Sequence, residues 1–187
     1  ANLLNEAKKP LMIVGQGIML SNAEEELLDF VEKTGIPVAS TLLGLGAFPS
    51  HHPLFVGMVG MHGNYAPNVK TNECDVLLAV GMRFDDRVTG RLDKYAKQAK
   101  IIHLDIDPAE VDKNVQTTVP VWGNCKETLP LLTNLIDKKS HPEWFNEFKI
   151  KLDIEDKTLI QKELFPTEGG LTMAEVINKL NVLTNGD

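Results

Sequence analysis

The sequence is short of cysteine, and this limits the kinds of domain that it can form. Its 187 residues include two cysteines, Cys74 and Cys125, which are far apart and outside any CxxC spacing. A disulfide-stapled domain or a structural zinc site is therefore not expected, and the cysteine content fits a reducing compartment. The hydrophobic fraction of 43% can build a core without either kind of staple.

Surplus basic charge and long apolar runs are also lacking. The formal net charge of -7 argues against a general nucleic-acid binder, although a local cluster of cations can still hold a small anionic ligand. No apolar run approaches the roughly 20 residues of a membrane span. The N-terminus lacks the basic-then-apolar pattern of a signal peptide. We therefore expect a cytoplasmic protein with no membrane or nucleic-acid partner.

Several familiar catalytic motifs do not occur. The sequence contains no GxSxG, no HExxH and no GxxxxGK[ST]. The adjacent His51 and His52 have no nearby acid or cysteine, which is typical of a loop rather than of a metal site. The sequence thus predicts no catalytic residue and no metal ligand in this chain.

The sequence does contain short apolar runs that alternate with amphipathic stretches. The apolar runs predict strands at 10–15, 36–41, 74–81, 100–107 and 119–124. Ser21 and Glu24 have the spacing of a capping box, for a helix that ends at Gly35. Asp107 and Glu110 have the same spacing and predict another helix start.

This alternation predicts an α/β fold. Parallel βαβ units with right-handed crossovers would give a doubly wound, Rossmann-like, mostly parallel sheet of about six strands, with helices on both faces. We expect this domain to cover residues 1–139. A charged helical linker is predicted at 140–168, and 169–187 resembles the start of a further domain that is cut short.

Doubly wound sheets bind ligands beyond the carboxyl ends of their strands. Gly15, Gln16 and Gly17 follow the first predicted strand, where glycines allow a tight turn and a close ligand. A plain strand-to-helix turn explains this pair of glycines equally well. Residues 57–65 are also rich in glycine. On their own they are more typical of a loop closed by core methionines than of a site for a flat aromatic ligand.

The segment VGMRFDDRVTGR concentrates cations directly after a buried strand. Arg83, Arg87 and Arg91 are four residues apart, so they would share one face if the segment were helical. Arginine binds phosphate or carboxylate in a bidentate manner, and Asp85 and Asp86 could hold the guanidinium groups in place. The alternative is an internally paired, solvated turn. The position at a strand end favours a ligand site.

Two later strand ends complete the predicted crevice. Asp105 or Asp107 could accept hydrogen bonds from ribose hydroxyls, while the other caps the next helix. Gly123, Asn124 and Cys125 could offer main-chain and amide contacts to a base.

Four stretches together closely resemble one family: GIPVASTLLGLGAFP, GMVGMHGNYAPN, GMRFDDRVTGR and IIHLDIDPAEVDKN. They are similar to the central domain of the acetolactate synthase (acetohydroxyacid synthase) catalytic subunit, among the thiamine-diphosphate-dependent enzymes. The resemblance is dense over residues 1–139 and weak beyond them. It implies that this domain binds FAD along the carboxyl edge of the sheet, where the flavin has no known redox role in the main reaction.

The resemblance also implies which residues contact the cofactor. The FAD-contact positions that it implies are Gly15, Gln16, Gly17, Thr41, Leu42, Gly60, Met61, His62, Gly63, Gly81, Arg83, Arg87, Val88, Asp105, Ile106, Gly123 and Asn124. Met61, Asp86 and Arg87 resemble positions at the mouth of the substrate channel. Two positions depart from the family pattern: Asn124 stands where the family commonly has Asp, and Gln16 where it has a further glycine.

For the full-length enzyme, the resemblance implies thiamine diphosphate and Mg²⁺ as cofactors. Such an enzyme would condense pyruvate with a second 2-keto acid in branched-chain amino-acid biosynthesis, as a homo-oligomer with a regulatory subunit. The glutamate that activates thiamine belongs to an N-terminal domain of the family and the GDG…N motif to a C-terminal domain. Because neither is in this sequence, we expect the chain alone to be inactive.

Other functions remain open on the sequence. The main alternative is a non-catalytic structural domain of another thiamine-dependent decarboxylase or oxidase, which binds ADP or nothing. An electron-transfer flavoprotein subunit would have a similar fold and also bind FAD, but the string RFDDRVTG does not favour it. An NAD-dependent deacylase is disfavoured further, because zinc cysteines and a catalytic histidine motif are missing.

Overall fold

The structure is a computed structural model and describes residues 1–185. The last two residues of the predicted segment 169–187 therefore lie outside the described part. A single sheet organises the fold, and all its strand pairings are parallel. Its order is β3-β2-β1-β4-β5-β6. The strands are β1 (Pro10–Val14), β2 (Val38–Ser40), β3 (Phe55–Met58), β4 (Val76–Val80), β5 (Lys100–Asp105) and β6 (Val119–Trp122).

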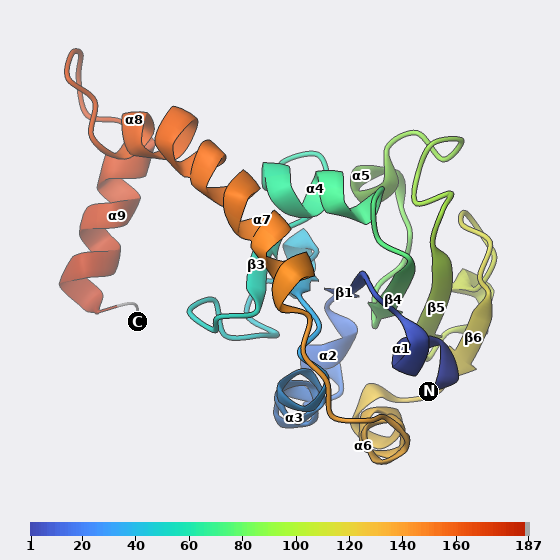
Figure 1. Cartoon of the computed structure of the whole chain (residues 1–187). Coiled ribbons are helices and arrows are strands. Elements are labelled where there is room, and N and C mark those ends of the chain that lie inside the picture. Colours follow the sequence, from blue (N-terminus) through green and yellow to red (C-terminus); the bar gives the residue numbers. More distant parts are fainter. Residues whose placement is uncertain (186–187) are drawn as a thin grey trace.

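Helices connect the strands and continue beyond them (Figure 1). The α-helices are α1 (Asn2–Glu6), α2 (Gly17–Leu20), α3 (Glu24–Thr34), α4 (Tyr65–Thr71), α5 (Asp86–Thr89), α6 (Cys125–Leu135), α7 (Pro142–Glu155), α8 (Gln161–Leu164) and α9 (Met173–Thr184). Short 3-10 turns are η1 (Leu42–Gly44) and η2 (Pro108–Glu110), and η3 (Asp156–Ile160) is a π-helical turn between α7 and α8.

Both faces of the sheet are buried, which explains why its central strands are continuous apolar runs. Along β1, Met12 and Val14 face one core, while Leu11 and Ile13 face the other. Helices α3 and α6 pack side by side over the first core, and α4 and α7 cover the second. Figure 1 shows these two helical layers around the strands. The predicted doubly wound α/β fold is confirmed.

The five predicted strands are confirmed, but a further strand was misinterpreted. β3 begins at Phe55 and includes Gly57 and Met58, which the sequence had suggested were part of a loop. It is an edge strand in which Val56 is the fully buried residue, and Gly57 has a left-handed φ of 99°. Its apolar pattern is therefore too weak to distinguish it from a glycine-rich loop.

The predicted capping box of Ser21 and Glu24 is wrong. The Ser21 hydroxyl donates instead to the carbonyls of Gly17 and Ile18, at 2.7 and 3.0 Å, and so ends the short helix α2. Helix α3 starts at Glu24 without a side-chain cap. Its predicted end at Gly35 is confirmed, with φ of 63°.

The second predicted capping box formed in part. Asp107 does cap η2, because its side chain accepts a hydrogen bond from the Ala109 amide at 2.9 Å. Glu110 does not close the box, because the Asp107 amide donates to Asp105 Oδ1, also at 2.9 Å. The helix expected here is one 3-10 turn.

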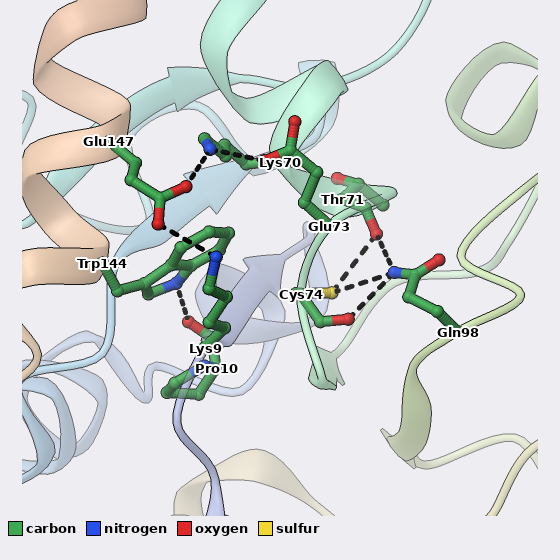
Figure 2. Close-up of polar contacts among 9 residues, drawn as sticks. All are labelled: Lys9, Pro10, Lys70, Thr71, Glu73, Cys74, Gln98, Trp144 and Glu147. Carbon is green, nitrogen blue, oxygen red and sulfur yellow. Dashed lines mark hydrogen bonds and ion pairs between the residues drawn. The ribbon is translucent and has the colours of Figure 1, made fainter.

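Helix α7 is fastened to the sheet by a tryptophan between two lysines (Figure 2). The Trp144 Nε1–H donates to the carbonyl of Pro10 at 2.8 Å, and the Nζ atoms of Lys9 and Lys70 lie 5.0 and 4.9 Å from its ring. Both lysines pair with Glu147 one turn further along. The first part of the predicted linker is thus packed against the sheet domain.

Helix α9 lies apart from the sheet and packs against α8 (Figure 1). Thr172 and Glu175 form a complete capping box at its start. Several of its apolar residues, among them Ile177 and Leu180, remain more than half exposed.

Candidate functional site

A cavity of about 740 Å³ opens at the carboxyl ends of the strands. β1 and β4 are neighbours in the sheet, whereas the chain continues from β1 toward β2 on one side and from β4 toward β5 on the other. Such a reversal is the topological switch point at which doubly wound sheets bind ligands. Residues that follow β1, β2, β4, β5 and β6 all line this cavity, which we call the switch-point pocket.

Glycines let the turns after β1 and β4 approach each other closely. The Gly17 amide donates to the Gly81 carbonyl at 2.9 Å, and the Gly15 amide donates to the Val80 carbonyl at 3.0 Å. A Cβ at Gly17 would lie 2.6 Å from Gly81 Cα, and Gly81 has a left-handed φ of 57°. These glycines and Gln16 line the pocket.

Two of the three arginines after β4 line the pocket. Asp85 caps α5 by accepting the Arg87 amide at 3.0 Å, and its Oδ2 lies 3.4 Å from Arg83 Nε. The side chains of Arg83 and Arg87 are 65% and 73% exposed, so both guanidinium groups can reach a ligand. Arg91 lies outside the pocket lining.

Arg83, Arg87 and Arg91 would share one face only if the whole segment were helical, and it is not. Helix α5 spans four residues, and Gly90 ends it with φ of 56°. The Arg91 guanidinium instead pairs with Asp93 at 2.6 Å.

Apolar side chains form another part of the wall. Leu42 follows β2 next to the polar lining residue Thr41, Val88 belongs to α5, and Ile106 follows β5. Leu42 is 64% exposed and Ile106 69%, so these apolar surfaces are available to a ligand. Asp85, Asp107 and Cys125, which the sequence had suggested for the crevice, also line the pocket. Sequence reasoning missed the other lining residues, namely Leu20, Ser21, Leu43, Met82 and Glu110.

Asp105 and Asn124 supply polar groups at the far end of the pocket. Asp105 Oδ1 accepts the Asp107 amide, which fixes the carboxylate at the strand end. Asn124 Oδ1 caps α6 by accepting the Lys126 amide at 2.9 Å, so its NH₂ group is the part that can donate to a ligand. Burial raises the pKa of the neighbouring Cys125 thiol to about 11, which makes it a weak nucleophile.

Some predicted residues lie beside the pocket rather than in its wall. Gly60, Met61, His62 and Gly63 form the turn between β3 and α4. The Met61 amide donates to the Arg87 carbonyl at 2.8 Å, so this turn is held against α5.

Asp86 and Gly123 are also outside the lining. The Asp86 side chain is 86% exposed on α5. The Gly123 amide donates to the carbonyl of Asp105, a lining residue, at 3.1 Å.

A second hollow of about 450 Å³ lies among α1, α6 and the first face of the sheet. Its lining is apolar except for Asn2 and Thr128, so it lacks the charges that a phosphorylated ligand requires. Within residues 1–185, no cluster of His, Cys, Asp and Glu could hold a metal ion, and no helix is long and apolar enough to cross a membrane.

Comparison with known proteins assigns the chain to a family. Residues 1–132 match the family model described as "Thiamine pyrophosphate enzyme, central domain". The chain is 45% identical over 187 residues to the probable acetolactate synthase large subunit of Methanocaldococcus jannaschii, covering 97% of this chain and 32% of that protein. It is 43% identical over 192 residues to acetolactate synthase 2, chloroplastic, of Nicotiana tabacum, covering 98% and 28%.

The acetolactate synthase large subunit of Corynebacterium glutamicum is 52% identical over 130 residues, covering 70% of this chain and 21% of that protein. The chain therefore spans about a third or less of the length of these curated relatives. The chain belongs to the thiamine pyrophosphate enzyme family, whose central domain it contains, and it is similar to the corresponding part of acetolactate synthase large subunits.

Proposed function

We propose that the switch-point pocket binds FAD, and that this chain is the FAD-binding central domain of an acetolactate synthase. The observation that carries the proposal is the convergence of cations, acceptors and glycines on one edge of the sheet. Arg83 and Arg87 line one side of the pocket, and Asp105 and Asn124 line another. A volume of about 740 Å³ falls within the range of small-molecule and cofactor sites.

The chemistry of the lining fits the parts of FAD. Arg83 and Arg87 suit the pyrophosphate, because guanidinium groups bind phosphate oxygens in a bidentate manner. Asp105 can accept hydrogen bonds from ribose hydroxyls, and the Asn124 amide can donate to adenine. Leu42 offers an exposed apolar surface to a flat ring.

Bound FAD would supply a ring that can accept a hydride, and this chain's residues would bind and orient it. The turn at 60–63 supports a second part of the proposal. It holds Met61 next to α5, where Met61 is 64% exposed and Asp86 86% exposed. We propose that Met61, Asp86 and Arg87 border the channel through which a 2-keto acid enters.

The full-length protein would use thiamine diphosphate and Mg²⁺, held by domains on either side of this one. It would condense pyruvate with a second 2-keto acid for branched-chain amino-acid synthesis in the cytoplasm, as a homo-oligomer with a regulatory subunit. The division into a central domain at 1–139, a linker at 140–168 and the start of a C-terminal domain at 169–187 belongs to the same proposal. The 187-residue chain alone should be inactive.

Equilibrium titration of the purified chain with FAD, ADP and riboflavin tests the proposal. We expect FAD to bind most tightly, because it alone occupies both the charged and the apolar parts of the pocket. ADP should bind more weakly and riboflavin more weakly still. Binding of ADP as tightly as FAD would favour a structural domain that holds an adenine nucleotide. Binding of none of the three would contradict the proposal for this chain.

A further inference from the structure

A buried histidine lies next to two residues that line the switch-point pocket, Met82 and Asp105. His103 is the fourth residue of β5 and has no exposed surface. It is two residues before Asp105, so both side chains project from the same face of the strand. Its Nδ1 atom is buried and has no hydrogen-bond partner within residues 1–185. His103 is absent from the pocket lining, so it can act on a ligand only through other residues.

His103 contacts the chain on both sides of Arg83. Its Nε2 lies 2.8 Å from the carbonyl oxygen of Met82. Its ring packs edge-on against Phe84, with the ring centroids 5.0 Å apart and an interplanar angle of 66°. Met82 and Phe84 are buried, while Arg83 between them points outward. The imidazole therefore fixes the backbone that presents Arg83 to the pocket.

The same nitrogen also faces Asp105. Nε2 lies 3.8 Å from Asp105 Oδ2, beyond a hydrogen bond but close enough for electrostatic attraction to the N–H. Because the Met82 carbonyl can act as an acceptor and not as a donor, Nε2 must carry the proton. In the neutral imidazole the unpartnered Nδ1 is then the unprotonated nitrogen. The single Nε2–H group thus faces two acceptors. One is the Met82 carbonyl, just beyond the end of β4, and the other is the Asp105 carboxylate at the end of β5.

The hydrogen bond also determines how the Met82–Arg83 peptide is oriented. In a trans peptide the carbonyl and the amide N–H point in opposite directions. With the Met82 carbonyl turned toward His103, the Arg83 N–H points away from the ring. Within residues 1–185, this N–H donates to no protein acceptor.

We propose that His103 is a positioning residue that aligns Arg83 and Asp105 for the 5′-phosphorylated ribose of a nucleotide. Phosphate would bind at the Arg83 side chain and its free amide, and the ribose hydroxyls at Asp105. The inference rests on the proposed function, since it concerns the same pocket. It adds a residue that does not touch the ligand but controls how the pocket binds the phosphorylated ribose.

Two substitutions of His103 separate positioning from packing. His103→Phe keeps a ring against Phe84 but removes the N–H donor. His103→Gln keeps a side-chain amide that can donate to the Met82 carbonyl. The dissociation constants of ADP and riboflavin are measured for each variant that unfolds cooperatively in urea. ADP contains the 5′-phosphorylated ribose, and riboflavin does not.

We expect His103→Phe to raise the Kd of ADP about tenfold, as the loss of one buried hydrogen bond would. The Kd of riboflavin should change by less than about twofold, and His103→Gln should recover ADP binding to within about threefold of wild type. If His103→Phe weakened the binding of ADP and riboflavin equally, the inference would be overturned, because a general packing defect affects both ligands. Wild-type binding of FAD and ADP, with ADP binding unchanged in His103→Phe, would overturn the role of His103 alone.

A ligand-free measurement covers the remaining cases. Nitrogen-15 NMR of the wild-type histidine rings reports which nitrogen of His103 carries the proton. A protonated Nε2 and an unprotonated Nδ1 would support the inference even if His103→Phe did not fold. The opposite tautomer would overturn it. A wild-type chain that binds neither FAD nor ADP would instead contradict the proposed function, whichever tautomer is found.

Discussion

The amide of Gly17 donates a hydrogen bond to the carbonyl of Gly81 across 2.9 Å, and this contact joins the turns after β1 and β4. Each turn belongs to one side of the switch point, and both glycines line the pocket. Side chains at either position would separate the two turns. The geometry of the pocket thus depends on two residues that have no side chain.

Gly17→Ala should therefore destabilise the chain and weaken ligand binding. The new Cβ would lie 2.6 Å from Gly81 Cα, so backbone must move. We expect a loss of about 1–3 kcal/mol in the free energy of unfolding, measured by urea titration. Gly170→Ala is the matched control, because a Cβ there meets nothing within 4 Å, and it should change stability by less than about 0.5 kcal/mol. Equal effects of the two substitutions would contradict this explanation.

Glu147 should make the stability of the chain depend on acid pH. Its hydrogen bonds with Lys70 and then Lys9 lower the pKa of its carboxyl group. A lowered carboxyl pKa contributes stability that is complete above the unfolded-state pKa and is lost as pH falls through the folded-state pKa. Burial lowers the pKa of Lys70, but hydrogen bonds with Glu147 and Glu73 outweigh this and raise it, so the lysine stays charged.

Glu147→Gln should lower the free energy of unfolding by about 1–2 kcal/mol at pH 7, because the buried Lys70 loses one of its two partners. The loss is limited because Lys70 still pairs with Glu73, and because the Glu147 side chain is partly exposed. The difference from wild type should be constant above about pH 5 and shrink toward pH 3. Urea unfolding across this range measures it, with the exposed Glu143→Gln as the control on the same helix. A difference that grows toward low pH would refute the assignment.

Cys125 should react slowly with thiol reagents, although it lines the pocket. Burial raises the pKa of its thiol to about 11, and that of Cys74 to about 12. At pH 8 we expect Cys125 to react roughly 100-fold more slowly than a free thiol, because the thiolate is the reactive form. Reaction with Ellman's reagent in a Cys74→Ala chain tests this, and urea should restore the rate. Reaction at the rate of a free thiol without urea would show that Cys125 is accessible.

The sequence predicted those parts of the fold whose cause is local or repetitive. β4 is buried along its whole length, so its apolar run identified it, and Gly35 ended α3 because glycine readily adopts a left-handed conformation. β3 was missed because half-exposed edge strands have little apolar pattern. The prediction that Ser21 caps α3 was wrong because its hydroxyl donates to a carbonyl of the preceding four-residue helix, α2.

The pocket was predictable to the extent that residues follow strand ends. Gly17, Arg83 and Asp105 were identified in this way, and all three line the cavity. Leu20 and Leu43 were missed because nothing local distinguishes a pocket leucine from a core leucine. The condition that would align Arg91 with Arg83 and Arg87 was a continuous helix, and α5 ends at Gly90 before it reaches Arg91. His103 appeared to be one residue of a buried strand until the ends of β4 and β5 were brought together.

The most direct test of a nucleotide pocket at the switch point is FAD and riboflavin binding by Arg83→Ala and Arg91→Ala. Both arginines are exposed, and both have an acidic neighbour. Arg83→Ala should raise the Kd of FAD at least about tenfold and leave riboflavin nearly unchanged, because riboflavin has no phosphate. Arg91→Ala should leave both unchanged. The account would be contradicted if Arg83→Ala weakened the binding of FAD and riboflavin equally. It would also be contradicted if Arg83→Ala and Arg91→Ala weakened FAD binding equally.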